Sequence, residues 1–137
     1  MKLPSNQCFG CGKDNPQGMK LKFIFDQRGA KFTARIRLNR HFAGPPGHAH
    51  GGIIATILDE AMSKLSKPNG VTAVTSEMTV NYLRPVPLDR PLRVESHETG
   101  SKGRQRFRSA EIADQRGTVL ARGTGVFVVV DPEKVFG

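Results

Sequence analysis

Residues 48–65, HAHGGIIATILDEAMSKL, carry the strongest structural signal in the chain. A Pro/Gly-rich run, residues 44–47, precedes them, and Pro68-Asn69-Gly70 follows them. Their apolar side chains recur at helical spacing: Ile53, Ile54, Ile57, Leu58, Ala61, Met62 and Leu65. This spacing predicts a helix over residues 51–66, buried nearly all round, which ends before the Pro and Gly residues.

Alternating polar and apolar residues predict strands on both sides of this helix. Two are expected before it, at 20–27 and 31–38, joined by a turn at Arg28-Gly29. Four are expected after it, at 71–83, 91–98, 104–114 and 117–130, with turns at 99–103 and 114–117. Short connections favour antiparallel neighbours. We therefore expect an α+β fold in which one long central helix is wrapped by a curved antiparallel sheet of about five to six strands.

The length of 137 residues suits a single domain over 1–137, with residues 1–19 as a loop-rich N-terminal cap. Hydrophobic residues make up 37% and charged residues 24%, as in globular proteins. No apolar run reaches the roughly 18 residues that span a bilayer, and the N-terminus lacks the apolar segment of a secretory signal. With two cysteines and no such signal, the expected location is the cytoplasm, away from membranes.

The net charge of +9 (21 − 12) suits an anionic partner: nucleic acid, a membrane surface or a phosphorylated small molecule. It equally suits a basic, solvated surface, because the Lys and Arg residues are spread along several strands. Aromatic residues for stacking single-stranded nucleic acid are few, with one Tyr and no Trp. We therefore expect no nucleic-acid partner.

Two short motifs could hold a metal. Cys8 and Cys11 have zinc-knuckle spacing but supply only two of four ligands, so the missing pair would come from another subunit. The pair His48 and His50 is followed by no further ligand pattern. We therefore interpret Cys8–Gly12 as a structural turn, and we expect no metal and no cofactor.

The order of elements, with His50-Gly51-Gly52 opening the helix and Asp59 nine residues after the histidine, resembles the hotdog-fold acyl-CoA thioesterases. The similarity is greatest to the branch that contains the phenylacetate-pathway type and mammalian thioesterase superfamily members 4 and 5. It covers residues 44–47, the run HGGIIATILDEAM, the run NYLRPVP (81–87), Lys102-Gly103-Arg104 and the N-terminal segment 8–18. It implies hydrolysis of an acyl- or aroyl-CoA to free acid and CoA, where CoA is part of the substrate. It also implies a homodimer, with a homotetramer as a dimer of dimers.

Gly51 and Gly52 are candidate oxyanion donors, because N–H groups at a helix N-terminus are unsatisfied and glycine lets substrate approach closely. Asp59 is the candidate base or nucleophile, with Glu60 as fallback; the alternative is a solvated helix carboxylate. Asp59 lies about 12 Å from Gly51 along the helix axis, at about 1.5 Å per residue. One chain therefore cannot easily present both groups to one carbonyl, which predicts a two-fold pair of sites shared between subunits. We expect Glu60 itself to face solvent or to support Asp59.

Other site residues follow from the resemblance. Thr75 matches a position where a hydroxyl lies beside the acid, although it is equally an ordinary strand residue. His50 is expected to fix the helix start rather than to act as a base. Many relatives carry Asn where this chain has Gly44, so the contact of that Asn is absent here or replaced by His41 or His50.

The resemblance assigns CoA contacts to Asn81, Arg84, Lys102, Gly103 and Arg104; arginine can bind phosphate through two hydrogen bonds. Each basic side chain is equally explained as a solvated one, and Arg106 and Arg108 would extend the same basic surface. Two alternatives remain open. One is a hotdog enoyl-CoA hydratase or dehydratase that pairs His50 with a carboxylate. The other is a non-catalytic CoA-binding module.

Overall fold

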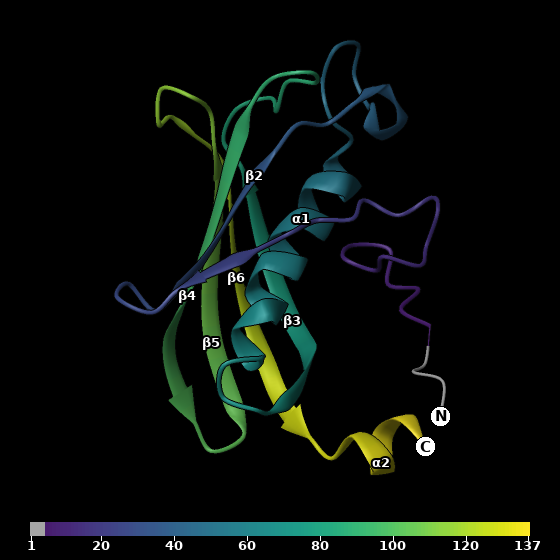
Figure 1. Ribbon diagram of the computed structural model, residues 1–137. Helices are drawn as coiled ribbons and strands as arrows, with labels where there is room; N and C mark the ends of the chain where they lie inside the picture. The colour runs from purple at the N-terminus through teal and green to yellow at the C-terminus, as the bar shows by residue number, and fades with distance from the viewer. Residues whose placement is uncertain (1–4) are drawn as a thin grey trace.

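In the computed structural model, which describes residues 5–137, a six-stranded antiparallel sheet curves around one long helix (Figure 1). The strand order is β1-β2-β4-β5-β6-β3. The strands are β1 Ile24–Asp26, β2 Lys31–Ile36, β3 Thr72–Tyr82, β4 Leu92–Lys102, β5 Gln105–Ala113 and β6 Val119–Val130. The helices are α1 Gly51–Ser63, a short α2 Pro132–Phe136, and 3-10 turns at Arg40–Phe42 and Lys64–Ser66. The predicted α+β architecture is confirmed.

The central helix packs against the concave face of the sheet through one continuous stripe. Its buried residues are Ile54, Ile57, Leu58, Ala61, Met62 and, in the following turn, Leu65. Fully burying a side chain of this size contributes about 1.5–3 kcal/mol. Close approach requires a small residue beneath the helix, because a Cβ at Gly123 of β6 would lie 3.3 Å from Cβ of Leu58. Between residues 5 and 137, neither helix has the length and apolar composition of a membrane span.

The N-terminal segment, residues 5–23, runs past α1 before it joins the sheet (Figure 1). Backbone hydrogen bonds from Met19 to Phe9 (2.7 Å) and from Leu21 to Gly10 (2.9 Å) hold it in a compact loop. The prediction of a strand over 20–27 is therefore wrong for its first half, because these residues bond to the loop instead of to β2. Residues 1–4 of the predicted cap lie outside the described residues.

The hairpin between β4 and β5 is tighter than the sequence suggested. The predicted turn at 99–103 is wrong, because β4 continues to Lys102 through a bulge between Glu98 and Gly100. Lys102 pairs with Gln105, which leaves only two residues in the turn, and Gly103 takes a φ of +58°. A positive φ is what a two-residue hairpin turn demands, so glycine at this position lets the ladder run on.

Side chains from the sheet hold the C-terminal end of α1. Ser96 Oγ donates to the carbonyl of Ala61 at 2.6 Å. Arg108 Nη1 donates to the carbonyl of Met62 at 3.1 Å and to Ser66 Oγ at 2.9 Å. The last carbonyls of a helix have no partner within the helix, so these two residues satisfy groups that water would otherwise have to reach.

Arg108 is itself buried, with 1% of its surface exposed. Its Nε donates to Glu98 Oε1 at 3.1 Å, and its guanidinium lies 4.8 Å from the ring centroid of Phe127. Burial lowers the pKa of Arg108, while the nearby Glu98 carboxylate raises it. The expectation that Arg108 adds to a basic surface is therefore wrong, because strand alternation turns it inward with Ala110 and Ile112.

Replacing Arg108 by Met should lower the free energy of unfolding by about 2–3 kcal/mol, because charge-assisted bonds to the helix end are lost and Glu98 loses its partner. Arg106→Met is the matched control on the same strand. The Arg106 guanidinium bonds only the nearby carbonyls of Gly103 and Gln105, so its loss should cost less than about 1 kcal/mol. Chemical denaturation measures both, and equal losses would contradict the capping role.

Candidate active site

The loop that delivers the start of α1 is fixed from two sides. The N–H of Ala49 donates to the carbonyl of Val86 at 2.8 Å, and the N–H of His50 donates to the carbonyl of Phe42 at 2.8 Å. Ala49 and Val86 are both buried. The first residues of α1 therefore rest on a packed support although they lie near the surface.

His50 caps the N-terminus of α1. Its Nδ1 accepts the N–H of Gly52 at 2.9 Å, and its backbone is extended, with φ −64° and ψ 139°. A cap of this kind satisfies one of the free donors of the first turn. The geometry agrees with the expectation that His50 fixes the helix start, and it occupies Nδ1 so that only Nε2 is free to transfer a proton.

The amide of Gly51 is free at the positive end of α1. Its N–H has no acceptor within residues 5–137, whereas its carbonyl accepts a 2.9 Å hydrogen bond from Tyr82 Oη. A Cβ at this position would meet its nearest neighbour, Tyr82 Oη, at an ordinary 3.6 Å. Packing within the described part of the chain therefore does not require glycine at Gly51.

Gly44 differs from Gly51, because contacts within the chain leave no room for a side chain at position 44. A Cβ there would lie 2.7 Å from Cα of His50, a distance that real Cβ atoms essentially never show. An Asn, as in many relatives, would need the loop before α1 to move. Within residues 5–137, neither the His41 nor the His50 side chain hydrogen-bonds to Gly44, whose N–H donates to the carbonyl of His48 at 2.9 Å.

Asp59 and Thr75 form the second part of the candidate site. Thr75 Oγ1 donates to Asp59 Oδ1 at 2.7 Å. Thr75 lies at a register shift between Thr75 and Glu77 on β3, and a bulge of this kind re-aims side chains. Asp59 is half-buried, and its second oxygen has no hydrogen-bond partner within the described part of the chain. One carboxylate oxygen is therefore held, and the other is available.

The rest of the polar side of α1 is used within the chain. Thr56 Oγ1 donates to the carbonyl of Gly52 at 2.9 Å. Glu60 accepts a 3.3 Å hydrogen bond from Cys8 Sγ and is half-buried beneath the N-terminal segment. The contact of Glu60 with the N-terminal segment was not predicted from the sequence, and the loop around Gly10 packs directly on its side chain.

The two parts of the site do not converge within one chain. Gly51 and Asp59 are about 12 Å apart along α1. Their partners on β3, Tyr82 and Thr75, are seven residues apart, which is about 23 Å along a strand. Tyr82 was not singled out from the sequence; the available signal was that the only tyrosine of the chain directly follows Asn81.

The predicted CoA-contact residues also fall into two groups, all of them exposed. Asn81 and Arg84 lie at the Tyr82 end of β3. The second group, Lys102, Gly103 and Arg104, lies at the β4–β5 turn, near the Thr75 end of β3. This turn adjoins β6, because the N–H of Val129 donates to the Arg104 carbonyl. In the same region, Phe127 of β6 pairs with Thr75 on one side and with Arg106 on the other. Each group accompanies one part of the candidate site.

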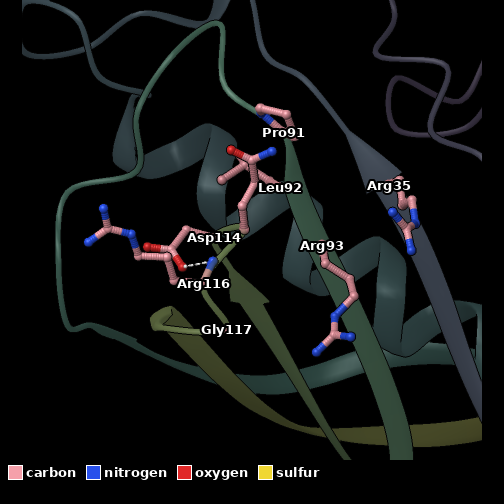
Figure 2. A pocket seen from close by; sticks show the side chains of 8 residues that line it. Arg35, Pro91, Leu92, Arg93, Asp114, Arg116 and Gly117 are labelled. Atoms are coloured by element: carbon pink, nitrogen blue, oxygen red, sulfur yellow. Dashed lines mark hydrogen bonds between the residues drawn. The ribbon is translucent and has the colours of Figure 1, made fainter.

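A cavity of about 440 Å³ lies elsewhere, at the ends of β2 and β4 and the β5–β6 turn (Figure 2). Arg35 and Arg93 are register partners on the face of the sheet away from α1, and Arg116 lies in the turn. The cavity is lined by Arg35, Pro91, Leu92, Arg93, Asp114, Gln115, Arg116 and Gly117. None of the site residues predicted from the sequence lines it, so the positive charge gathered here is separate from them.

Comparisons with known proteins identify the family of the chain. The sequence model of the thioesterase superfamily matches residues 46–121. The acyl-coenzyme A thioesterase THEM4 of Bos taurus is 33% identical over 135 residues, which cover 97% of this chain and 55% of that protein. The chain thus spans about half the length of the curated relatives that it matches.

Two solved structures are similar in both fold and sequence. Protein RHA08564, a thioesterase superfamily protein, has a TM-score of 0.84 and 26% identity, over 90% of this chain and 60% of that one. The BH2602 protein from Bacillus halodurans, solved with CoA, has a TM-score of 0.69 and 27% identity, over 80% of this chain and 74% of that one.

Substitution of Gly44, in the loop before α1, and of Gly51, at the start of α1, should separate their roles. Gly44→Ala should lower the free energy of unfolding by about 1–3 kcal/mol, because the added methyl overlaps the His50 backbone. Gly51→Ala should change it by less than about 1 kcal/mol, since space exists and alanine favours the helix. Thermal and chemical denaturation of both variants measure this difference, and a Gly44→Ala protein as stable as Gly51→Ala would refute the steric assignment.

Proposed function

Because the chain belongs to the thioesterase superfamily, we propose that it hydrolyses an acyl- or aroyl-CoA thioester to the free acid and CoA. The observation that carries the proposal is the Asp59 carboxylate, held by Thr75 at 2.7 Å through one oxygen and free at the other. The unbonded N–H of Gly51, at the N-terminus of the same helix, supplies the complementary donor. The similarity to acyl-coenzyme A thioesterases and to a protein solved with CoA supports the substrate class.

In the proposed reaction, the two parts of the site act on one carbonyl. Asp59 accepts a proton from water as the water oxygen attacks the thioester carbon, or attacks that carbon directly. The carbonyl oxygen becomes an oxyanion, and the Gly51 N–H at the positive end of α1 stabilises it. The carbon–sulfur bond then breaks, and the CoA sulfur takes up the proton that Asp59 accepted. If Asp59 instead attacks the carbon directly, the CoA thiolate leaves and an acyl–Asp59 anhydride forms. Water then hydrolyses this anhydride to the free acid and the Asp59 carboxylate, and the same water supplies the proton that the CoA sulfur takes up. Thr75 keeps the carboxylate oriented throughout.

The proposed site is completed by a second copy of the chain. Strand β3 ends the sheet order, so over residues 5–137 one of its edges pairs with no other strand. An exposed edge of eleven residues is a template for pairing with another chain. In a two-fold antiparallel pairing of β3 with its copy, the Thr75 end of one strand meets the Tyr82 end of the other. Asp59 of one subunit would then face the Gly51 amide of its partner.

The same pairing gathers the proposed CoA contacts. It brings the Lys102-Gly103-Arg104 turn of one subunit towards Asn81 and Arg84 of the other. Arginine binds phosphate through paired hydrogen bonds, and CoA carries a pyrophosphate and a 3′-phosphate. The hydratase alternative would have to use Nε2 of His50, because Nδ1 is occupied by the helix cap.

Gly51→Pro removes the proposed oxyanion donor and little else. Proline is favoured at the first position of a helix, and the extended backbone of His50 suits a following proline. We expect stability near that of the wild type and a fall in kcat of about 10²–10³. Gly51→Ala keeps the N–H and should remain more active than Gly51→Pro. The oxyanion role is refuted if the two variants hydrolyse acyl-CoA equally fast.

Asp59→Asn should lower kcat by about 10²–10⁴, as expected for the loss of a base. Thr75→Ala should lower it less, and Thr75→Ser should restore most of the activity because the hydroxyl is kept. The control is Glu111→Gln on β5, which should match the wild type. A panel of acyl-CoA substrates of varied chain length measures these rates, and an Asp59→Asn enzyme of full activity would disprove the assignment.

Mixed dimers test whether the site is shared. Asp59→Asn and Gly51→Pro subunits, refolded together, should regain about one quarter of wild-type activity, because half the dimers have one intact site of two. Each variant refolded alone stays inactive. If both groups acted within one chain, the mixture would be as inactive as the separate variants.

A further inference from the structure

A cluster of metal-ligating side chains lies outside the proposed reaction. The Sγ atoms of Cys8 and Cys11 and a carboxylate oxygen of Glu60 all lie within 4.8 Å of one another. The two cysteines come from the N-terminal segment, and Glu60 comes from α1, 52 residues after Cys8. From the sequence alone, further ligands were expected only from another subunit, whereas the fold brings a third ligand from the same chain.

The loop that carries the cysteines is closely fitted to Glu60. Its turn is closed by a 2.8 Å hydrogen bond from the N–H of Gly12 to the carbonyl of Cys8. A Cβ at Gly10 would collide with the Glu60 side chain, and a Cβ at Gly12 would lie 2.5 Å from the backbone N of Cys8. Glycine at position 12 is therefore required by the backbone of the loop itself, and glycine at position 10 leaves room for the Glu60 side chain.

We propose that Cys8, Cys11 and Glu60 bind one zinc ion through two thiolates and one carboxylate oxygen. Zinc takes sulfur and oxygen ligands of this kind in a tetrahedral arrangement. With Zn–S bonds of about 2.3 Å, two sulfurs of a tetrahedral site lie about 3.8 Å apart. Donor atoms already within 4.8 Å therefore need a rearrangement of only about 1 Å.

Charge and access agree with such a site. Two thiolates, one carboxylate and Zn²⁺ sum to −1. Burial raises the pKa of the Cys11 thiol to about 11, while the neighbouring Lys64 lowers it, so the ion must displace the Cys11 proton. Both thiols must lose their protons, so binding releases two protons per ion. A cavity of about 350 Å³, lined in part by Cys11, Glu60 and Ser63, opens beside the cluster and leaves the fourth position to water.

The ion would fasten the N-terminal segment to α1 one residue from Asp59. Without it, the only side-chain bond from Cys8 to the helix is the 3.3 Å contact with Glu60. Metal coordination contributes free energy of folding where its ligands come from separate segments. Zinc should therefore raise the melting temperature of the protein and protect residues 5–19 from proteolysis.

The test uses the purified full chain, kept reduced and stripped of metal with a chelator. Zinc titrated by calorimetry should bind one ion per chain and release two protons. Cobalt substituted for zinc should show the visible absorption of a tetrahedral site and a thiolate charge-transfer band. Cys8→Ser, Cys11→Ser and Glu60→Gln should each weaken binding about tenfold or more. Glu133→Gln, an exposed carboxylate on α2, is the control and should bind as the wild type does.

Glu60→Gln carries the decisive result, because it tests the ligand that the fold supplies and keeps both cysteines. The proposal is overturned if Glu60→Gln binds zinc within twofold of the wild-type affinity. It is also overturned if the wild type binds no zinc while a thiol assay shows that both cysteines are reduced and reactive. The readouts are metal content, proton release and absorption, not hydrolysis. If the protein binds no zinc at this cluster, the thioesterase proposal is unaffected. If the protein binds zinc but hydrolyses no thioester, the zinc proposal is unaffected.

Discussion

The packing of α1 into the curved sheet governs the other contacts of the molecule. The buried stripe of the helix packs on the sheet, and Gly123 leaves room for Leu58 there. Both ends are fixed: His50 and the Tyr82 hydroxyl hold the beginning, and Arg108 holds the end. Because the helix is rigid and held at both ends, its geometry alone sets the distance between the Gly51 amide and the Asp59 carboxylate.

The fixed distance between Gly51 and Asp59 makes the edge of β3 that pairs with no other strand of residues 5–137 important for the proposed reaction. A donor and an acid at separate points of one helix can act on one small group only if a second helix is brought alongside in the reverse direction. An antiparallel strand edge provides such a reversal, because two-fold pairing exchanges the ends of the strands. In the proposed enzyme, the sheet edge is therefore a catalytic requirement as well as a surface for association.

Local patterns in the sequence were sufficient for the helix and for most strands, because periodicity depends on neighbouring residues. Asp59 and Gly51 could likewise be named from spacing along the helix and from a resemblance. Arg108 could not be placed, because a buried arginine becomes favourable only beside the carbonyls at the end of α1. The contact of Cys8 with Glu60 was also beyond reach, since it joins residues 52 positions apart with no shared local pattern.

Tyr82 has a practical consequence through its bond to the carbonyl of Gly51. The chain contains one tyrosine and no tryptophan, and phenylalanine emits only weakly, so Tyr82 is its dominant intrinsic fluorophore. The emission therefore comes from the start of α1, about half exposed to solvent, with no label attached. A change in Tyr82 fluorescence can thus report the binding of a ligand or of another subunit at the Gly51 amide.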